Sequence, residues 1–165
     1  MKDMFCFQCQ QTAHNTGCEG KAGVCGKKAD TANFQDKIIS ALIGLARAAR
    51  AGNPTEATDA LVEKALFTTI TNVNFNNSTI KTIRTEVEKE KHRLSAESFD
   101  DYPMERIWDG NADIRSLKSL ILFGLKGMAA YAYHARVLGH TNREVDAFFY
   151  EALYHLGEDE PQDVL

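Results

Sequence analysis

Cysteine is absent from the chain after position 25, so the last 140 of the 165 residues contain no thiol. The chain also lacks an excess of basic residues, because 19 Lys and Arg stand against 23 Asp and Glu for a net charge of -4. It lacks a long apolar run as well, since Lys118, Lys126 and His134 interrupt its most apolar stretch, residues 117–135. These absences predict a protein that neither binds nucleic acid nor spans a membrane.

The start of the chain and its glycine pattern exclude two further classes. Residues 1–6 contain no apolar segment of the kind that directs secretion, so we expect a cytoplasmic protein. No glycine-rich turn follows a strand-like pattern, which argues against a nucleotide-binding fold. No internal repeat or low-complexity linker interrupts the sequence, and 165 residues are enough to bury one or two small cores.

All four cysteines lie within one short segment that is rich in glycine and polar residues. They are Cys6, Cys9, Cys18 and Cys25, and their spacing is C-x2-C-x8-C-x6-C. Cysteines separated by two residues can direct both sulfurs toward one point, and glycines let the backbone bend back to deliver another pair. The pattern therefore indicates a metal centre.

Three kinds of thiol chemistry remain open on spacing alone. A structural zinc site favours two C-x2-C pairs, and only Cys6 and Cys9 have that spacing. A disulfide framework needs an oxidising compartment, for which the sequence has no secretory signal. An iron–sulfur cluster accepts uneven gaps because it presents several irons to the chain. Nearby Lys21, Lys27 and Lys28 either offset the charge of such a cluster or form a solvated loop.

Two parts of the sequence resemble one known family. Residues 4–13, MFCFQCQQTA, and residues 23–27, GVCGK, resemble the amino terminus of the hybrid-cluster proteins, also called prismane proteins or hydroxylamine reductases. A second resemblance covers residues 119–140 and 144–150. Both ends of the chain match in the family's order, whereas residues 52–112 carry little that is specific to it.

The resemblance implies that Cys6, Cys9, Cys18 and Cys25 ligate the family's proximal iron–sulfur cluster. The gap of eight residues between the second and third cysteine is typical of members with a 4Fe–4S cluster, and some members with 2Fe–2S have a longer gap. The last gap of six residues departs from the usual five, so the spacing favours 4Fe–4S without excluding 2Fe–2S. With four cysteines available, His14 is expected to be a bystander.

The resemblance also implies that this chain is the amino-terminal part of a longer enzyme. Members of the family reduce hydroxylamine or nitric oxide at a hybrid iron–sulfur–oxygen cluster, whose His, Glu and Cys ligands would lie outside this chain. We therefore expect no catalytic residue here, an inactive fragment, and transfer of electrons from a ferredoxin or an NADH-dependent reductase to the remaining domains of the same enzyme. The alternatives are a stand-alone iron–sulfur electron carrier or redox sensor, and a zinc-stabilised helical interaction module.

Apolar periodicity in the rest of the chain predicts an all-α fold, a helical bundle of about five helices preceded by a Cys-rich cluster-binding loop. We divide the chain into an iron–sulfur cluster-binding segment, residues 1–30, and a helical bundle domain, residues 31–165. The predicted helices cover residues 34–51, 55–72, 79–94, 113–138 and 141–156.

Side-chain patterns assign an environment to two of these helices. The helix over 113–138 is the most apolar, so we expect it to be central, with Gly124 and Gly127 allowing close contact with another helix. The helix over 79–94 combines a narrow apolar stripe with a charged face that we expect to be solvated.

Polar residues near the predicted helix starts are expected to act as N-caps. They are Asp30, Thr31 or Asn33 for the first helix, Asn77 or Ser78 for the third, and Thr141 with Glu144 for the last.

The remaining predictions concern segments that the helical pattern leaves out. Residues 95–112 form a long acidic connection, which we expect Ile107 and Trp108 to pin to the core while its acidic side chains are solvated. We expect His134 and His140 to be buried and hydrogen-bonded rather than part of a proton relay. Residues 158–163 are expected to form a frayed end.

Overall fold

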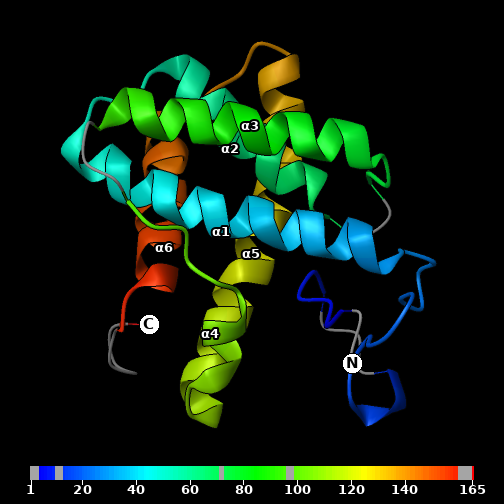
Figure 1. Cartoon of the computed structure of the whole chain (residues 1–165). Coiled ribbons are helices and arrows are strands. Elements are labelled where there is room, and N and C mark those ends of the chain that lie inside the picture. Colours follow the sequence, from blue (N-terminus) through cyan, green and yellow to red (C-terminus); the bar gives the residue numbers. More distant parts are fainter. Residues whose placement is uncertain (1–3, 10–12, 71–72, 96–98, 160–164) are drawn as a thin grey trace.

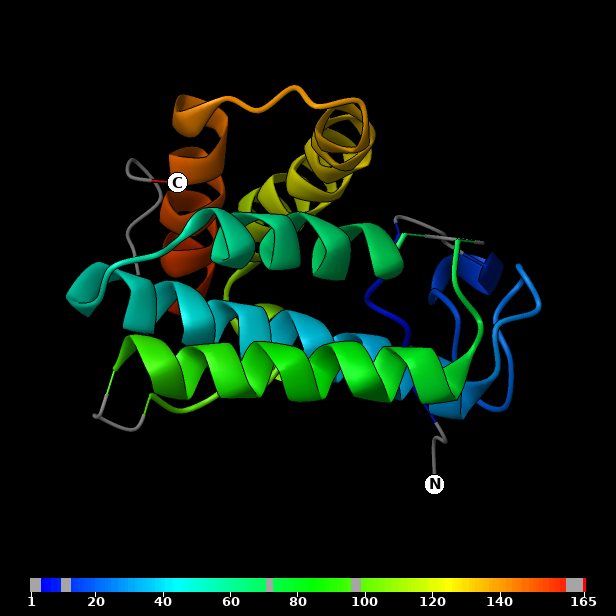
Figure 2. The ribbon, with the colours of Figure 1, turned by 90° about the horizontal axis from the view of Figure 1, so that it is seen from above.

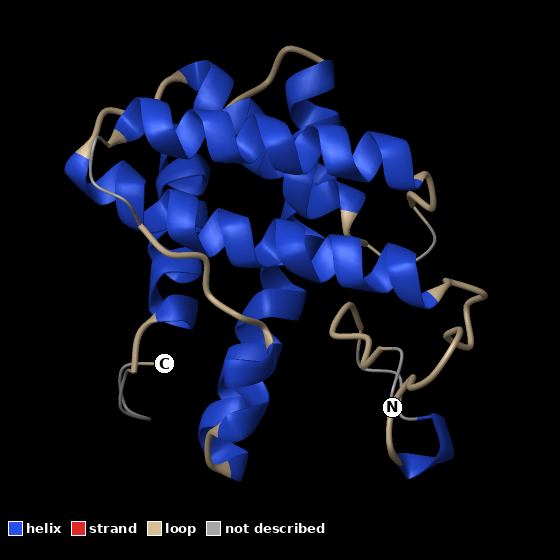
Figure 3. Cartoon of the chain, in the orientation of Figure 1, coloured by secondary structure: helices blue, strands red, loops and turns tan. Residues whose placement is uncertain are grey.

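The computed structural model describes residues 4–9, 13–70, 73–95, 99–159 and 165, apart from the side chains of Ala13 and Trp108. Within these ranges the chain forms six α-helices and one 3-10 turn, Ala13–Asn15, and contains no strand (Figure 3). The predicted all-α class is therefore confirmed. The additional helix is a short one, α4, Glu105–Asp109, inside the expected connection.

Helix α1, Ala29–Ala51, forms the centre of the fold and packs against α2, α3 and α6 (Figure 1). These three partners span Glu56–Thr68, Asn77–Leu94 and Arg143–Gly157. The apolar side chains of α1 without exposed surface include Ile38, Ile39, Leu42, Ile43, Leu45 and Ala46. Because burial of apolar surface is the main stabilising contribution in folding, α1 organises the core.

Helix α5, Ala112–Val137, is not central, which corrects the prediction. It packs mainly against α2, α4 and α6, and it leaves Leu120, Tyr131 and Val137 69%, 83% and 69% exposed. An apolar sequence makes burial favourable, but it does not determine how many neighbours a helix finds.

The helices form two groups that cross each other. Figures 1 and 2 show α1, α2 and α3 running along one direction, with α5 and α6 crossing them. The segment before α1 lies near the amino end of that helix, on the right of Figure 1. A backbone hydrogen bond of 3.1 Å from Ala29 N to Lys21 O joins this segment to the first turn of α1.

Three asparagines cap helices in the structure. The side chains of Asn76, Asn111 and Asn142 accept hydrogen bonds from the first-turn amides of α3, α5 and α6. The expected caps Asn77, Ser78 and Thr141 are therefore wrong by one or two positions, because each helix starts where an Asn side chain reaches the free amides.

The first two helices differ from the prediction at one end each. α1 begins at Ala29, five residues earlier than expected, and none of the proposed caps precedes it; Lys28 occupies the cap position without a side-chain hydrogen bond. α2 ends at Thr68 instead of residue 72, and a reciprocal pair of hydrogen bonds between Thr55 and Thr58 caps its start.

The connection between α3 and α5 is packed against the core. Tyr102, Met104 and Ile107 are each 2% exposed, so the predicted anchoring role of Ile107 is confirmed. The side chain of Trp108 lies outside the described residues. The acidic side chains of this connection are not all solvated, because Asp101 Oδ1 lies 2.6 Å from Lys91 Nζ.

This ion pair also corrects the prediction of a fully solvated charged face on α3. Lys91 is buried, and its Nζ contacts Glu88 at 2.8 Å in addition to Asp101. The pair packs on Gly44 of α1, where an added Cβ would lie 3.3 Å from both Lys91 Cδ and Asp101 Oδ1. The predicted close contact at Gly124 and Gly127 is wrong, because a Cβ at either position would meet no atom within 4 Å.

The carboxyl end of α5 is open to solvent. His134 and His140 are both exposed, so the prediction that they are buried is wrong. The His134 ring instead contacts Phe67 and Tyr133 edge-on, at centroid distances of 5.2 and 5.7 Å. Over the described part of the chain, every helix is too short or too polar to cross a lipid bilayer.

The first residue of the expected frayed end, Glu158, is held by contacts with the helices. Glu158 Oε1 pairs with Arg47 Nε at 3.2 Å, and the Glu158 carbonyl accepts a hydrogen bond of 2.6 Å from Lys118 Nζ. Residues 160–163 of that predicted end lie outside the described residues.

Candidate metal centre

Backbone pairing folds the cysteine segment back on itself. The Cys6 amide donates a hydrogen bond of 3.0 Å to the Cys18 carbonyl, and Gly20 N donates one of 3.3 Å to Met4 O. Phe5 and Glu19 form an isolated β-bridge between these bonds. The first cysteine of the pattern therefore lies beside the third, although eleven residues separate them in the sequence.

A tight turn positions the fourth cysteine. Gly23 N donates to Lys27 O at 2.8 Å, and Gly26 N donates to Gly23 O at 2.9 Å. Gly26 has φ of +82°, a conformation that glycine adopts without steric cost. The turn directs Cys25 back toward Cys18.

The sulfurs of Cys18 and Cys25 converge on Gly23. A Cβ added at Gly23 would lie 3.5 Å from Cys18 Sγ and 3.7 Å from Cys25 Sγ. The Val24 amide donates a hydrogen bond of 3.5 Å to Cys18 Sγ. Amide hydrogen bonds to sulfur stabilise thiolates in iron–sulfur sites, and glycine leaves the space between the two sulfurs free.

The Cys6 thiol is half-buried, and its neighbours affect its pKa. Burial raises the pKa of the Cys6 thiol, and Cys9 lies close enough to add to this rise. A backbone hydrogen bond from Gln8 and the positive charge of Lys27 oppose the rise. All four cysteines are described, half-buried and free of disulfides.

The four sulfurs do not surround a single point. In the part of the chain that the structure describes, no three His, Cys, Asp or Glu side chains approach closely enough to hold one metal ion. Cys18 and Cys25 form one pair at Gly23, and Cys9 lies near Cys6. A zinc ion needs all four ligands at one point, whereas an iron–sulfur cluster takes its thiolates at separate irons. His14 is exposed, with φ of +54°.

A buried lysine lies beside these thiols. Lys27 is 1% exposed, and within the described residues its Nζ has no hydrogen-bond partner. A buried ammonium without a partner is unfavourable, and a negatively charged group next to Cys6 would satisfy it. The cysteine segment therefore fits an anionic thiolate cluster. Lys21 and Lys28 are exposed, so the three lysines of the sequence analysis have different environments.

A second buried lysine approaches the segment from α5. Lys126 is 4% exposed, and its Nζ donates to the Gln8 carbonyl at 3.3 Å and to Gln8 Oε1. Gln8 Nε2 in turn donates to Asp36 Oδ1 on α1. Burial lowers the pKa of Lys126 to about 7 and raises the pKa of Asp36 to about 7.

Sequence patterns alone did not predict this group. Lys126 was expected only to interrupt an apolar stretch, and no role was predicted for Gln8 or Asp36. The available signal was a lysine on an otherwise apolar helix, which indicates a buried partner when the stretch does not cross a membrane.

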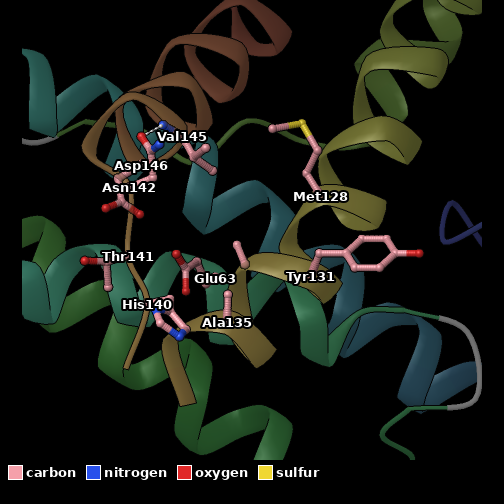
Figure 4. Close-up of a pocket in the computed structure, with 10 residues that line it drawn as sticks. Glu63, Met128, Tyr131, Ala135, His140, Thr141, Asn142, Val145 and Asp146 are labelled. Carbon is pink, nitrogen blue, oxygen red and sulfur yellow. Dashed lines mark hydrogen bonds between the residues drawn. The ribbon is translucent and has the colours of Figure 1, made fainter. Parts of the chain in front are cut away.

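A separate cavity of about 390 Å³ lies between α2, α5 and α6 (Figure 4). Met128, Tyr131 and Val145 contribute apolar walls, and the carboxylates of Glu63 and Asp146 lie at its rim. Both carboxylates accept hydrogen bonds from Arg136, so they are already paired. The cavity is a largely apolar depression on the exposed side of α5.

A family model and several curated proteins match most of this chain. The Prismane/CO dehydrogenase family model matches residues 4–165. A hydroxylamine reductase of Bacteroides thetaiotaomicron is 40% identical over an alignment of 176 residues, which covers 93% of this chain and 32% of that protein. A hydroxylamine reductase of Nitratidesulfovibrio vulgaris is 37% identical over 190 residues, covering 94% of this chain and 34% of that protein.

A hydroxylamine reductase of Bacteroides fragilis is 39% identical over 180 residues, with 95% of this chain and 33% of that protein covered. The chain thus spans about a third of the length of the curated relatives it matches. The match extends from the cysteine segment through α6, so this chain belongs to the Prismane/CO dehydrogenase family.

Proposed function

We propose that this chain is the amino-terminal electron-transfer region of a hydroxylamine reductase and that its four cysteines hold an iron–sulfur cluster. The observation that carries the proposal is the convergence of Cys18 and Cys25 on Gly23, next to a segment in which Cys6 pairs with Cys18 through the backbone. The family membership and the names of the relatives support it.

The cysteine segment has three properties that a cluster site needs. Amides approach the sulfurs of Cys6 and Cys18, Lys27 supplies a buried positive charge, and Phe7 anchors the segment in the hydrophobic core. When bound, the cluster supplies one-electron transfer with little structural change. The gap of eight residues between Cys9 and Cys18 favours 4Fe–4S over 2Fe–2S.

We assign separate roles to this chain and to the rest of the longer protein because the relatives are about three times as long as the match. Residues 1–30 form the cluster-binding segment and residues 31–165 the helical domain that supports it. The reduction of hydroxylamine or nitric oxide, at a hybrid iron–sulfur–oxygen cluster, is assigned to the part of the longer protein that this chain does not match. A cytoplasmic ferredoxin or NADH-dependent reductase is the proposed electron donor, and no residue of this chain is assigned a catalytic role.

An exposed apolar surface at α5 supports packing of the remaining domains on this helix. We define this surface by Leu120, Tyr131 and Val137 on α5 and by Leu138 at its C-cap, which are 69%, 83%, 69% and 76% exposed. The cavity of Figure 4 continues it toward α6. Large exposed apolar patches are typical of interfaces, and two thirds of each relative lies outside the match.

The proposal is tested by anaerobic purification of this chain with iron and sulfide analysis and paramagnetic resonance of the reduced protein. We expect about four iron and four sulfide per chain and a signal from a half-integer spin state. Cys18→Ala should lose most of the iron, whereas His14→Ala should retain it. Stoichiometric zinc without iron would instead support the zinc-stabilised module, and empty thiols would contradict both metal sites.

A further inference from the structure

Two buried lysine side chains lie beside the cysteine segment. Gln8 sits between Cys6 and Cys9 in the sequence, and Lys126 Nζ lies 3.3 Å from its carbonyl oxygen. Lys27 lies near enough to Cys6 to affect its charge, and near enough to Lys126 that the two ammonium groups repel. Both lysines are almost fully buried, at 1% and 4% exposure.

The protein groups around these lysines do not balance their charge. Asp36 is the one carboxylate that the described contacts connect to Lys126, and it does so through the side-chain amide of Gln8. When both lysines are protonated, the one carboxylate leaves an excess positive charge, and burial without an anion lowers the pKa of Lys126 to about 7. Since uncompensated buried charge is costly, the two lysines point to an anion bound next to Gln8, which lies between Cys6 and Cys9 in the sequence.

We infer that Lys126, acting from α5 together with Lys27, supplies the positive charge that compensates the thiolate-bound cluster and raises its reduction potential. The inference rests on the proposed function. Reduction adds a negative charge to the cluster, so a fixed positive charge nearby stabilises the reduced state.

Lys126 is a better test of this role than Lys27. Lys27 is two residues from Cys25 and its carbonyl accepts the Gly23 amide, so its replacement would also disturb the turn that holds a ligand. Lys126 belongs to a separate helix. It contacts the cysteine segment only through Gln8 among the hydrogen bonds described.

The experiment is a redox titration at pH 7, monitored by paramagnetic resonance, of the anaerobically loaded chain. Lys126→Met removes the charge and keeps the length of the side chain, and we expect its midpoint potential to be lower than that of the unmodified chain. Lys126→Arg keeps the charge and should have a potential close to the original value. Lys118→Met is the matched control, because Lys118 is also buried on α5 but donates to the Leu156 and Glu158 carbonyls, remote from the cysteines.

Each outcome decides between the inference and its failure. An unchanged potential in a loaded Lys126→Met protein overturns the inference, and so does an equal decrease in Lys118→Met. If Lys126→Met and Lys126→Gln remain helical by circular dichroism but bind no iron, Lys126→Arg decides the outcome. Iron binding by Lys126→Arg supports the charge-compensating role, and absence of iron in Lys126→Arg overturns it. Absence of iron and sulfide in the unmodified chain would contradict the proposed function itself.

Discussion

Arg136 on α5 forms a two-point ion pair with Glu63 on α2: Nε lies 2.8 Å from Oε2, and Nη2 lies 3.0 Å from Oε1. The same Nη2 contacts Asp146 Oδ1 on α6 at 2.9 Å. The Glu63 side chain is 3% exposed, so Arg136 rather than solvent satisfies its carboxylate oxygens. One guanidinium thereby joins α2 to the consecutive helices α5 and α6.

Removal of Arg136 should be strongly destabilising. Arg136→Met leaves two buried or half-buried carboxylates without a cation, and we expect a loss of about 3–5 kcal/mol in the free energy of unfolding. Lys64→Gln is the control, because the Lys64–Glu86 pair is exposed on both sides and should contribute less than about 1 kcal/mol. Urea unfolding followed by circular dichroism measures both. Equal losses would show that the Arg136 network is no more important than a surface pair.

Substitutions in α1 and α5 should have very different effects. Leu42→Ala removes a side chain with no exposed surface and should cost about 2–5 kcal/mol, because it leaves a cavity in the core. Leu120→Ala, on the exposed side of α5, should change stability by less than about 0.5 kcal/mol. Thermal and urea unfolding of the two variants compare them. A larger loss for Leu120→Ala would mean that α5, not α1, is central.

Gly124→Ala should stabilise the chain. Gly124 lies in the interior of α5, and an added Cβ would meet no atom within 4 Å. Alanine restricts the unfolded chain and favours the helix, so we expect a gain of roughly 0.5–1 kcal/mol. Gly44→Ala, where the Cβ would press on Lys91 and Asp101, should give no such gain. A loss of stability in Gly124→Ala would indicate a helix contact at this position.

Gly23→Val should reduce cluster incorporation. Its Cβ would already contact the sulfurs of Cys18 and Cys25, and the two methyl groups would enter the space between them. We expect the iron content after anaerobic purification to fall by more than half. Val24→Ala changes an adjacent side chain that is 68% exposed and should leave the iron content unchanged. Full iron content in Gly23→Val would show that cluster binding does not need the space at Gly23.

The chain should lose stability above pH 10 through Tyr150. Burial and a hydrogen bond of 2.7 Å to Asp59 raise the pKa of the Tyr150 phenol above its usual value of about 10. Because the folded state holds this proton more tightly than the unfolded state, the stabilisation is complete below pH 10 and decreases as pH rises beyond it.

This pH dependence has a direct control. Tyr150→Phe should show a smaller decrease in the free energy of unfolding between pH 9 and pH 11 than the unmodified chain. Tyr131→Phe, at a position that is 83% exposed, should keep the original decrease. Urea unfolding at each pH provides the comparison, and identical slopes for all three proteins would exclude Tyr150 as the cause.

Local patterns predicted most of the secondary structure. The apolar stripe of Ile80, Ile83 and Val87 predicted α3, and all three side chains are buried. The helix caps were predicted less well, since Asn76 and Asn142 compete with neighbouring polar residues that have similar capping ability. A cap is decided by where the backbone leaves the helical conformation, which depends on the packing of the helix.

The amino-acid sequence by itself determined the helical class, the family resemblance and the grouping of four cysteines in one segment, because these depend on periodicity and on spacing along the chain. Only the tertiary structure decided that α1 is central, that Lys27 is buried while Lys28 is exposed, and that Lys126 reaches Gln8 across 118 positions. Burial and electrostatic environment arise from contacts between residues far apart in sequence, and local patterns carry little information about such contacts.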